Sequence, residues 1–558
     1  MFGADKRNQR YKLSISLILS IFSVALIAVN YTDSIFPVLP AAILVISPLV
    51  LYISKYRLST ILAIIILISV CLRLGIFSYP TGLVGIDPAK VEAIRVQRVM
   101  SARNISPIDI NFYEDAALFY VLAATWAILG RLSAANSLVL FPIILGISIP
   151  LSSGIIASAL ARCRGDGDRK WVLNLSVFLT TIAGTTLQYS YWPIAQSLGV
   201  VYFSLAVVLV IFYISGGDAR FSLLLVIFII SAAYTHKLPV IVLLLSIAVA
   251  VVIHTTRNLD RSASILAFPA LFTIIVATLQ WSFITDYIAK IIVKVMVTLT
   301  TEGASASPKF TMTAATEVLS GILGTLYRRG HAITILIFSG LFWIIALRKS
   351  DTLRASVALG ASAVTVSFIG LAIYAPSQEV IPPLRALFMA EFLLIALISA
   401  SLLKYERRGI VYAFIALIVV SQLASPVAAP DSYKSPRFYL TDSEIAGKDF
   451  TFRYVNEGVH TDLYASYYNT PTMINSGGGN NQFKELNEGL YNASLIIKIP
   501  PYVLYRHRAE VYLSRLQQYK LLWRPEIFLS KNSNKIYDSG STALYHNTKP
   551  PSRFTTED

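Results

Sequence analysis

Charged residues are scarce in this sequence. They make up 14% of its 558 residues, whereas a soluble domain usually carries about 25%. There are only two cysteines, Cys71 in an apolar segment and Cys163 in a predicted inner loop, so no disulfide framework is expected. The sequence also has no P-loop, Rossmann glycine fingerprint, HExxH sequence or CxxC pair. These absences leave no sequence evidence for a soluble nucleotide-binding enzyme or a zinc enzyme.

What the sequence has instead is hydrophobic residues, which account for 55% of the chain. A helix that spans a bilayer core needs about 20 of them. We predict about thirteen transmembrane helices in an all-α polytopic fold, at 12–30, 36–54, 58–79, 136–161, 171–190, 192–214, 221–236, 238–254, 263–285, 331–347, 353–375, 384–403 and 409–427.

The net charge of +16 is explained by the loops between these segments. Lys6 and Arg7 precede the first segment, and Arg169, Lys170 and Arg354 lie in later short loops. Basic loops of this kind remain on the cytoplasmic side. We therefore expect a multi-pass protein of the cell membrane with a cytoplasmic N-terminus, and no nucleic acid among its partners. Thirteen passes place the C-terminus outside the cytoplasm.

One apolar segment, 116–130, is too short for this scheme. If it crossed the membrane, every later basic loop would face outward, so we predict a re-entrant or surface-lying helix on the outer side. The alternative is that 136–161 folds as two short passes broken near Pro150.

The chain divides into three predicted units. Residues 1–57 form a two-helix membrane extension, and 58–427 form the main transmembrane domain with outer loops 80–135 and 286–330. Residues 428–558 form a small α+β extracytoplasmic domain. In this domain 495–499 is predicted to be a strand, 506–521 a helix, and 535–546 a hairpin turning at Asp538-Ser539-Gly540.

Acidic residues in the first outer loop are candidates for catalysis. Asp87, just after the third predicted span, could be a general base or a metal ligand. The sequence Asp87-Pro88 is also a good helix start, with Asp87 as the N-cap. Glu114 and Asp115 form a second acidic site or another helix start. A divalent metal is therefore an open possibility, and the cofactor stays unknown.

Basic residues near the same side are candidates for binding an anion. Arg95 lies on an amphipathic segment that would either attract lipid phosphates or form a solvated basic face. Arg385 and Arg73 lie within predicted spans near their outer ends, where ionisable groups usually face a partner or a polar cavity. Arg385 is the best candidate for holding a phosphate. The alternative is a structural ion pair of either arginine with Glu391.

Three other residues complete the candidate site. Trp192, in the outer turn YSYWPIAQSLG, is either an interface aromatic or part of a binding wall. Gln196, one turn deeper, could bind a hydroxyl-rich group. His236, in YTHKL at an outer helix end, is a weak ligand signal because no residues with zinc-like spacing accompany it.

These motifs together resemble the integral-membrane glycosyltransferases of the GT-C fold. The resemblance covers most of 58–558 and rests on GIDPAK, NFYEDAALFY, YWPIAQSLG, YTHKL and the terminal NKIYDSGSTALYH, in that order. It implies sugar transfer from a polyprenyl-phosphate-linked donor, with Asp87 as base or metal ligand and Arg385 or His236 at the donor phosphate. The acidic pair usual in the family is not present at Asp87, so Asp109, Glu114 and Asp115 remain alternatives for the acid.

The resemblance therefore predicts a membrane glycosyltransferase that acts on the extracytoplasmic side. Its acceptor would be a glycan, a lipid or a protein, and the lipid bilayer is its other partner. Two alternatives stay open at this stage. One is a lipid-linked glycan flippase or transporter, and the other is a non-catalytic scaffold with the same fold.

Overall fold

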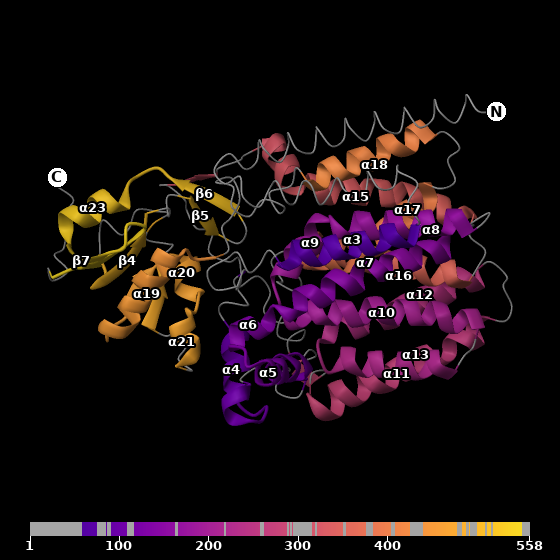
Figure 1. Cartoon of the computed structure of the whole chain (residues 1–558), viewed down its shortest axis with the longest axis horizontal. Coiled ribbons are helices and arrows are strands. Elements are labelled where there is room, and N and C mark those ends of the chain that lie inside the picture. The colour runs from indigo at the N-terminus through magenta and orange to yellow at the C-terminus, as the bar shows by residue number, and fades with distance from the viewer. Residues whose placement is uncertain are drawn as a thin grey trace.

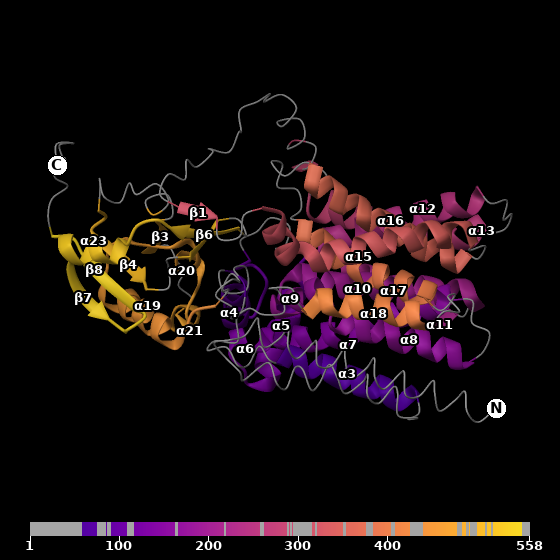
Figure 2. The same ribbon diagram turned by 90° about the horizontal axis from the view of Figure 1, so that it is seen from above.

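The computed structural model describes residues 58–74, 85, 91–108, 116–161, 166–216, 219–256, 262–286, 289, 290, 293, 315–317, 321–349, 353–374, 383–402, 408–423, 439–476, 482–486, 490, 499–507, 511–514 and 517–548. Long helices lie side by side in a bundle, and a region that contains strands lies beyond one end of it (Figures 1 and 2). We call residues 439–548 the tail, and the neighbouring end of the bundle the tail-facing end.

The bundle and its tail-facing end consist of helices that follow the apolar segments. They are α3 (Leu58–Leu74), α4 (Ala93–Ala102), α5 (Leu118–Gly130), α6 (Ala134–Leu138), α7 (Leu140–Leu160), α8 (Asp166–Thr181), α9 (Gly184–Tyr191), α10 (Ala195–Gly216), α11 (Ala219–Ala233), α12 (Lys237–Thr255), α13 (Ser262–Thr278), the π-helical η3 (Leu279–Ile284), α15 (Gly321–Lys349), α16 (Leu353–Tyr374), α17 (Pro383–Leu402) and α18 (Arg408–Leu423).

Seven of the described helices are long and apolar enough to cross a membrane: Ala134–Leu160, Ala195–Ser215, Lys237–Thr255, Ile265–Ile284, Arg329–Arg348, Leu353–Gly370 and Arg385–Leu402. Four shorter apolar helices accompany them: Ser59–Leu74, Leu118–Gly130, Ala219–Ala233 and Val411–Gln422. The chain is a multi-pass membrane protein, as predicted. The number of about thirteen spans is not confirmed, and the predicted spans 12–30 and 36–54 lie outside the described residues.

The helix α17 lies at the centre of the bundle. Its span is 94% buried, the highest fraction of the seven. A helix that is apolar on all sides is typically surrounded by other helices, and the run from Ala386 to Ile398 is of this kind apart from Glu391. Helices α7, α8, α15 and α16 pack around it.

The short segment 116–130 forms α5. Its 13 residues are about 20 Å long, less than the roughly 30 Å of a bilayer core. Helices α4, α5 and α6 lie between the bundle and the tail (Figure 1), which agrees with a helix that does not cross. The alternative, a break of the next segment near Pro150, is wrong, because α7 continues through this proline for 21 residues.

The tail contains a five-stranded sheet. Its order is β3 (Phe483–Glu485), β2 (Val459–Thr461), β4 (Tyr502–Arg506), β8 (Thr542–His546) and β7 (Asn534–Asp538). Four helices accompany it: α19 (Asp442–Tyr454), α20 (Leu463–Tyr467), α21 (Pro471–Asn475) and α23 (Pro525–Asn532). The predicted terminal hairpin is confirmed: β7 and β8 are antiparallel, and Asp538 Oδ1 accepts a hydrogen bond from the Gly540 amide at 2.8 Å in the turn. The predicted strand 495–499 lies outside the described residues, except for Ile499, which is not in a strand.

The prediction of a helix at 506–521 is wrong. This segment contains β5 (Val511–Ser514) and β6 (Gln517–Leu521), which pair antiparallel to each other. Strand β6 also pairs with β1 (Ala315–Glu317) of the second outer loop. Strand pairing with a distant segment overrode the local pattern, and it joins the outer loop to the tail.

A buried charge cluster fastens α19 to the rest of the tail. Arg506 donates to both carboxylate oxygens of Asp462, at 2.7 and 2.5 Å, and lies 3.5 Å from Glu444. Lys448, which is fully buried, donates to the carbonyl oxygens of Ala465 and Tyr468. Burial lowers the pKa of Lys448 well below its usual 10.5.

Candidate functional site

Three of the predicted binding residues begin helices at the tail-facing end. Gln196 is in the first turn of α10, His236 is the N-cap of α12, and Arg385 is in the first turn of α17. Gln196 and His236 are buried, with 5% and 9% of their surface exposed, and Arg385 is half-buried. The structure thus assembles residues from sequence positions almost 200 apart at one end of the bundle.

His236 packs beside α10 and lies within electrostatic range of Arg385. Its Nδ1 accepts a hydrogen bond from the Leu238 amide at 3.2 Å, which caps α12. Its Cβ lies 3.1 Å from the place where a side chain at Gly199 would begin, so it packs against α10 one turn beyond Gln196. Arg385 is close enough to act electrostatically on the imidazole.

An aromatic wall lies beside these residues. The ring of Tyr189 stacks on Phe388 with centroids 5.0 Å apart and meets Trp192 edge to face at 5.6 Å. Phe388 follows Arg385 by three residues on α17, so both lie on the same side of that helix. The turn that carries Trp192 is fastened by Ser197, whose hydroxyl donates to the Trp192 carbonyl at 3.0 Å.

The candidate acids Asp87, Glu114 and Asp115 lie outside the described residues, as does Asp109. Two described residues near them in sequence contact the site. Gly85 has a φ of +103°, and a Cβ added to it would lie 2.8 Å from the Trp192 indole. The close approach and the positive φ both require glycine.

The second contact is made by Leu118, at the start of α5. Its amide donates to the carbonyl oxygen of Tyr234 at 3.0 Å, two residues before His236. The segment that contains Glu114 and Asp115 therefore leads directly into a helix that is anchored beside the His236 turn.

Arg73 has a different environment from Arg385. It is fully buried, and its guanidinium donates to the Ser190 hydroxyl at 3.0 Å and to the hydroxyl and carbonyl of Ser69 at 2.8 and 3.0 Å. Its stem passes so close to Gly146 that an added Cβ would lie 2.4 Å from Cδ. These contacts tie α3 to α7 and α9, and none of them joins Arg73 to Arg385, His236 or Gln196.

The alternative interpretation, an ion pair of Glu391 with Arg73 or Arg385, is not formed by these described residues. Glu391 is fully buried in the middle of α17, and its carboxylate accepts from the Thr186 amide and hydroxyl at 2.6 and 2.7 Å and from the Thr185 amide at 3.4 Å. These amides lie in the first turn of α9, where backbone N–H groups lack partners within the helix. A helix start therefore supplies the hydrogen bonds that an arginine would have supplied in the alternative interpretation.

A second polar contact inside the bundle escaped the sequence analysis. The Gln422 side chain accepts from the Gly184 amide at 2.8 Å and donates to the His331 carbonyl at 3.1 Å. A glutamine within an apolar segment was the available signal, since such residues usually bond across helices. Gly184 gave no signal, because its role depends on a backbone amide.

Arg95 is buried between α4 and α5. Its guanidinium donates to the Tyr120 hydroxyl at 3.1 Å and lies 3.9 Å from the Glu92 carboxylate. It is therefore not part of a solvated or lipid-facing basic surface, although Arg103 on the same segment is exposed. Within the described part of the chain, no group of three or more His, Cys, Asp or Glu residues could hold a metal ion.

No protein-family model matches the sequence, and no curated protein matches it. Several solved structures are similar. The Archaeoglobus fulgidus oligosaccharyltransferase in its apo form superposes with a TM-score of 0.50 at 12% identity, over 82% of this chain and 70% of that one. ArnT from Cupriavidus metallidurans, bound to undecaprenyl phosphate, has a TM-score of 0.46 at 10% identity, over 88% and 98%.

The arabinofuranosyltransferase AftD from Mycobacteria has a TM-score of 0.45 at 14% identity, over 88% of this chain and 40% of that one. Identities this low establish only an architecture. The superposition on the oligosaccharyltransferase, together with the helical bundle and the small sheet, shows that this chain has the GT-C fold of membrane glycosyltransferases.

Proposed function

We propose that this protein transfers a sugar from a polyprenyl-phosphate-linked donor to an acceptor on the extracytoplasmic side of the membrane. The observation that carries the proposal is the assembly of Arg385, His236, Gln196 and Trp192 at the tail-facing end of a GT-C bundle. Such an enzyme must hold a phosphate at the membrane surface, exclude water and present a base to the acceptor.

The donor phosphate would be held by Arg385 and His236. A guanidinium forms two parallel hydrogen bonds with phosphate oxygens. His236 uses Nδ1 as an acceptor, so a neutral ring carries its proton on Nε2 and can donate there. An anion near both groups would be stabilised as the bond from the sugar to the phosphate breaks.

The sugar would lie against Trp192, with Gln196 as a hydrogen-bonding partner for its hydroxyls. The Trp192 ring is held by Tyr189 and Gly85, and a preorganised wall orients a bound ring without further ordering cost. Arg73 is fully buried, and its Nε and Nη1 donate to Ser190 and Ser69, so it would position α3 and α9 and would not touch the donor.

Asp87 is the proposed base, with Glu114 or Asp115 as alternatives. Two peptide units join Asp87 to Gly85, which limits the distance between their Cα atoms to roughly 7 Å. Because Gly85 packs on Trp192, this short connection supports a role for Asp87 near the sugar. The anchoring of Leu118 beside the His236 turn supports the alternatives in the same way.

The reaction proceeds by one displacement in this proposal. The carboxylate removes the proton of an acceptor hydroxyl, the acceptor oxygen forms a bond to the anomeric carbon, and the bond from that carbon to the phosphate oxygen breaks. Polyprenyl phosphate leaves with its negative charge next to Arg385 and His236. The configuration at the anomeric carbon is inverted.

The orientation and the domain division belong to the same proposal. The basic residues of the loops near 161–170 and 348–354 favour the cytoplasm for the end of the bundle opposite the tail. The tail, as part of 428–558, would then be extracytoplasmic beside the site. Residues 58–427 would form the catalytic membrane domain, and 1–57 an additional membrane extension.

The test is transfer by the purified full-length protein, with cell-envelope lipids as donors and envelope glycans, lipids and proteins as acceptors. We expect Asp87→Asn to lower the rate by roughly 10²–10⁴-fold, as is typical for loss of a general base. Asp168→Asn, a matched change at the opposite end of the bundle, should leave the rate unchanged. An additional series with EDTA tests whether a divalent metal is needed.

The phosphate site is tested separately with Arg385→Gln and Arg385→Lys. The glutamine variant should lose roughly 10²-fold or more in rate, as when one transition-state donor is removed, and the lysine variant should recover part of it. Undiminished transfer by either Asp87→Asn or Arg385→Gln would exclude that residue's role. Translocation of the lipid-linked sugar without transfer would establish a flippase, and specific glycan binding without either activity would establish a scaffold.

A further inference from the structure

A pocket with a volume of about 480 Å³ lies at the opposite end of the bundle from the sugar-binding residues. It is lined by the end of α7, the start of α8, the end of α10 and the start of α16. Three cations line it, Arg169, Lys170 and Arg354, and no acidic side chain is among its described lining residues. The volume falls within the roughly 300–1,000 Å³ of small-molecule sites.

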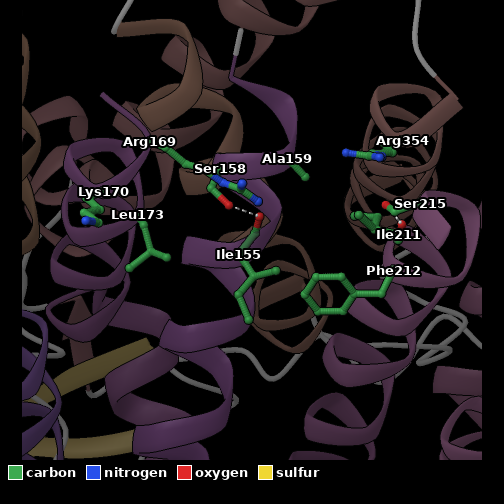
Figure 3. A pocket seen from close by; sticks show the side chains of 10 residues that line it. All are labelled: Ile155, Ser158, Ala159, Arg169, Lys170, Leu173, Ile211, Phe212, Ser215 and Arg354. Atoms are coloured by element: carbon green, nitrogen blue, oxygen red, sulfur yellow. Dashed lines mark hydrogen bonds between the residues drawn. The ribbon is translucent and has the colours of Figure 1, made fainter. Parts of the chain in front are cut away.

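The lining separates into a charged rim and an apolar floor. Arg169, Lys170 and Arg354 all come from the first turns of α8 and α16. Ile155 and Phe212 lie about one turn before the ends of α7 and α10, and Leu173 lies one turn after Arg169 on α8. In Figure 3 the guanidinium groups of Arg169 and Arg354 lie on opposite sides of the upper part, and Ile155 and Phe212 lie below them.

The cations are available to a ligand. All three are exposed, and the structure gives none of them a carboxylate partner among its described residues. The two hydroxyls of the lining are already engaged as donors: Ser158 donates to the Ile155 carbonyl at 2.8 Å, and Ser215 to the Ile211 carbonyl at 2.6 Å. An anion in this pocket would therefore be held by the arginine and lysine donors.

We propose that this pocket binds the phosphate headgroup of an anionic phospholipid in the leaflet opposite the sugar-transfer site. The positive rim favours a phospholipid whose negative phosphate is not neutralised by a positive group in the same headgroup. The floor lies one helical turn deeper in the membrane, where the first part of an acyl chain would contact Phe212, itself stacked on Phe221 at 5.2 Å. Basic pockets between helices at the cytoplasmic surface bind lipid headgroups by this chemistry.

A soluble phosphate compound would bind the same cations without contacting the apolar floor. The following experiment distinguishes such a compound from a phospholipid. Delipidated full-length protein in neutral detergent is titrated with short-chain phosphatidylglycerol, short-chain phosphatidylcholine and glycerol phosphate, and complexes are counted by native mass spectrometry. We expect saturable binding of phosphatidylglycerol, and much weaker binding of the other two. Binding of glycerol phosphate as tight as that of phosphatidylglycerol would overturn the lipid assignment.

The pocket itself is tested with the double variant Arg169→Gln/Arg354→Gln. A cation at a membrane surface strengthens anionic-lipid binding by about five-fold, so the double variant should bind phosphatidylglycerol about 25-fold more weakly. Arg348→Gln removes a cation from α15 that is exposed and does not line the pocket, and it should bind like the wild type.

Thermal midpoints in lipid-free detergent check that the double variant is folded. Lys170→Gln provides a second, milder change of the rim, with about five-fold weaker binding expected. Equal phosphatidylglycerol binding by the wild type and both rim variants would refute the site. The site would also be refuted if Arg348→Gln weakened phosphatidylglycerol binding as much as the double variant did.

Discussion

Replacing Gly146 by alanine should disrupt the buried Arg73 contacts. A Cβ at this position would lie 2.4 Å from Cδ of Arg73 and 3.1 Å from its Nε. Non-bonded carbons need about 3.5–4.0 Å, so the arginine stem must shift by roughly 1 Å or more. Its hydrogen bonds to Ser190 and Ser69, at 2.8–3.0 Å, cannot all survive such a shift.

The magnitude follows from these bonds. A hydrogen bond to a charged group contributes about 1.5–3 kcal/mol, and the loss of one or two of them is partly offset by about 1 kcal/mol from the better helix propensity of alanine. We expect Gly146→Ala to lower the free energy of unfolding by about 0.5–5 kcal/mol. The assay is the thermal midpoint in detergent, with Gly340→Ala as the control, because a Cβ there meets nothing within 4 Å.

A double-mutant cycle tests whether Arg73 transmits the effect. Arg73→Ala removes the two atoms nearest to the new methyl group and leaves only the Ser69 carbonyl oxygen, at 3.3 Å, so adding Gly146→Ala to this variant should cost much less. The reasoning is refuted if Gly146→Ala has the same midpoint as Gly340→Ala. It is also refuted if the cost of Gly146→Ala is unchanged when Arg73 is absent.

Three further predictions concern other parts of the molecule. Gly85→Ala should reduce sugar transfer by roughly ten-fold or more, because it displaces the aromatic wall that orients the sugar. Gly540→Ala, where φ is also positive but an added Cβ meets nothing within 4 Å, should leave transfer unchanged in the same assay. Thr186→Val removes the hydroxyl that donates to Glu391 at 2.7 Å and should lower the free energy of unfolding by about 1–3 kcal/mol, seen as a lower thermal midpoint. Burial lowers the pKa of Lys448 from 10.5. Between the lowered pKa and 10.5 the unfolded chain therefore binds more protons than the folded chain, and the free energy of unfolding rises with pH. Lys448→Met should abolish this rise, which is measured as thermal midpoints across the alkaline range.

The membrane class and the fold were predictable from the sequence because they depend on composition and local order. Apolar segments of spanning length need no tertiary partner to be recognised, and the terminal hairpin is specified by the local turn at Asp538–Gly540. The choice of Arg385, His236, Gln196 and Trp192 as candidates also rested on local chemistry. All four are polar or amphipathic residues at the ends of apolar segments.

The contacts between these residues were decided by the tertiary structure. An ion pair with an arginine was one possibility for the Glu391 carboxylate, but its partners are two backbone amides of α9, and a sequence does not show where an amide will point. The segment 506–521 forms strands because β6 can pair with β1, just over 200 residues earlier. Gly85, Gly146 and Gly199 matter for what they pack against, and the lipid pocket exists only because four separate helix ends meet. Each of these depends on atoms brought together by folding, which no local pattern encodes.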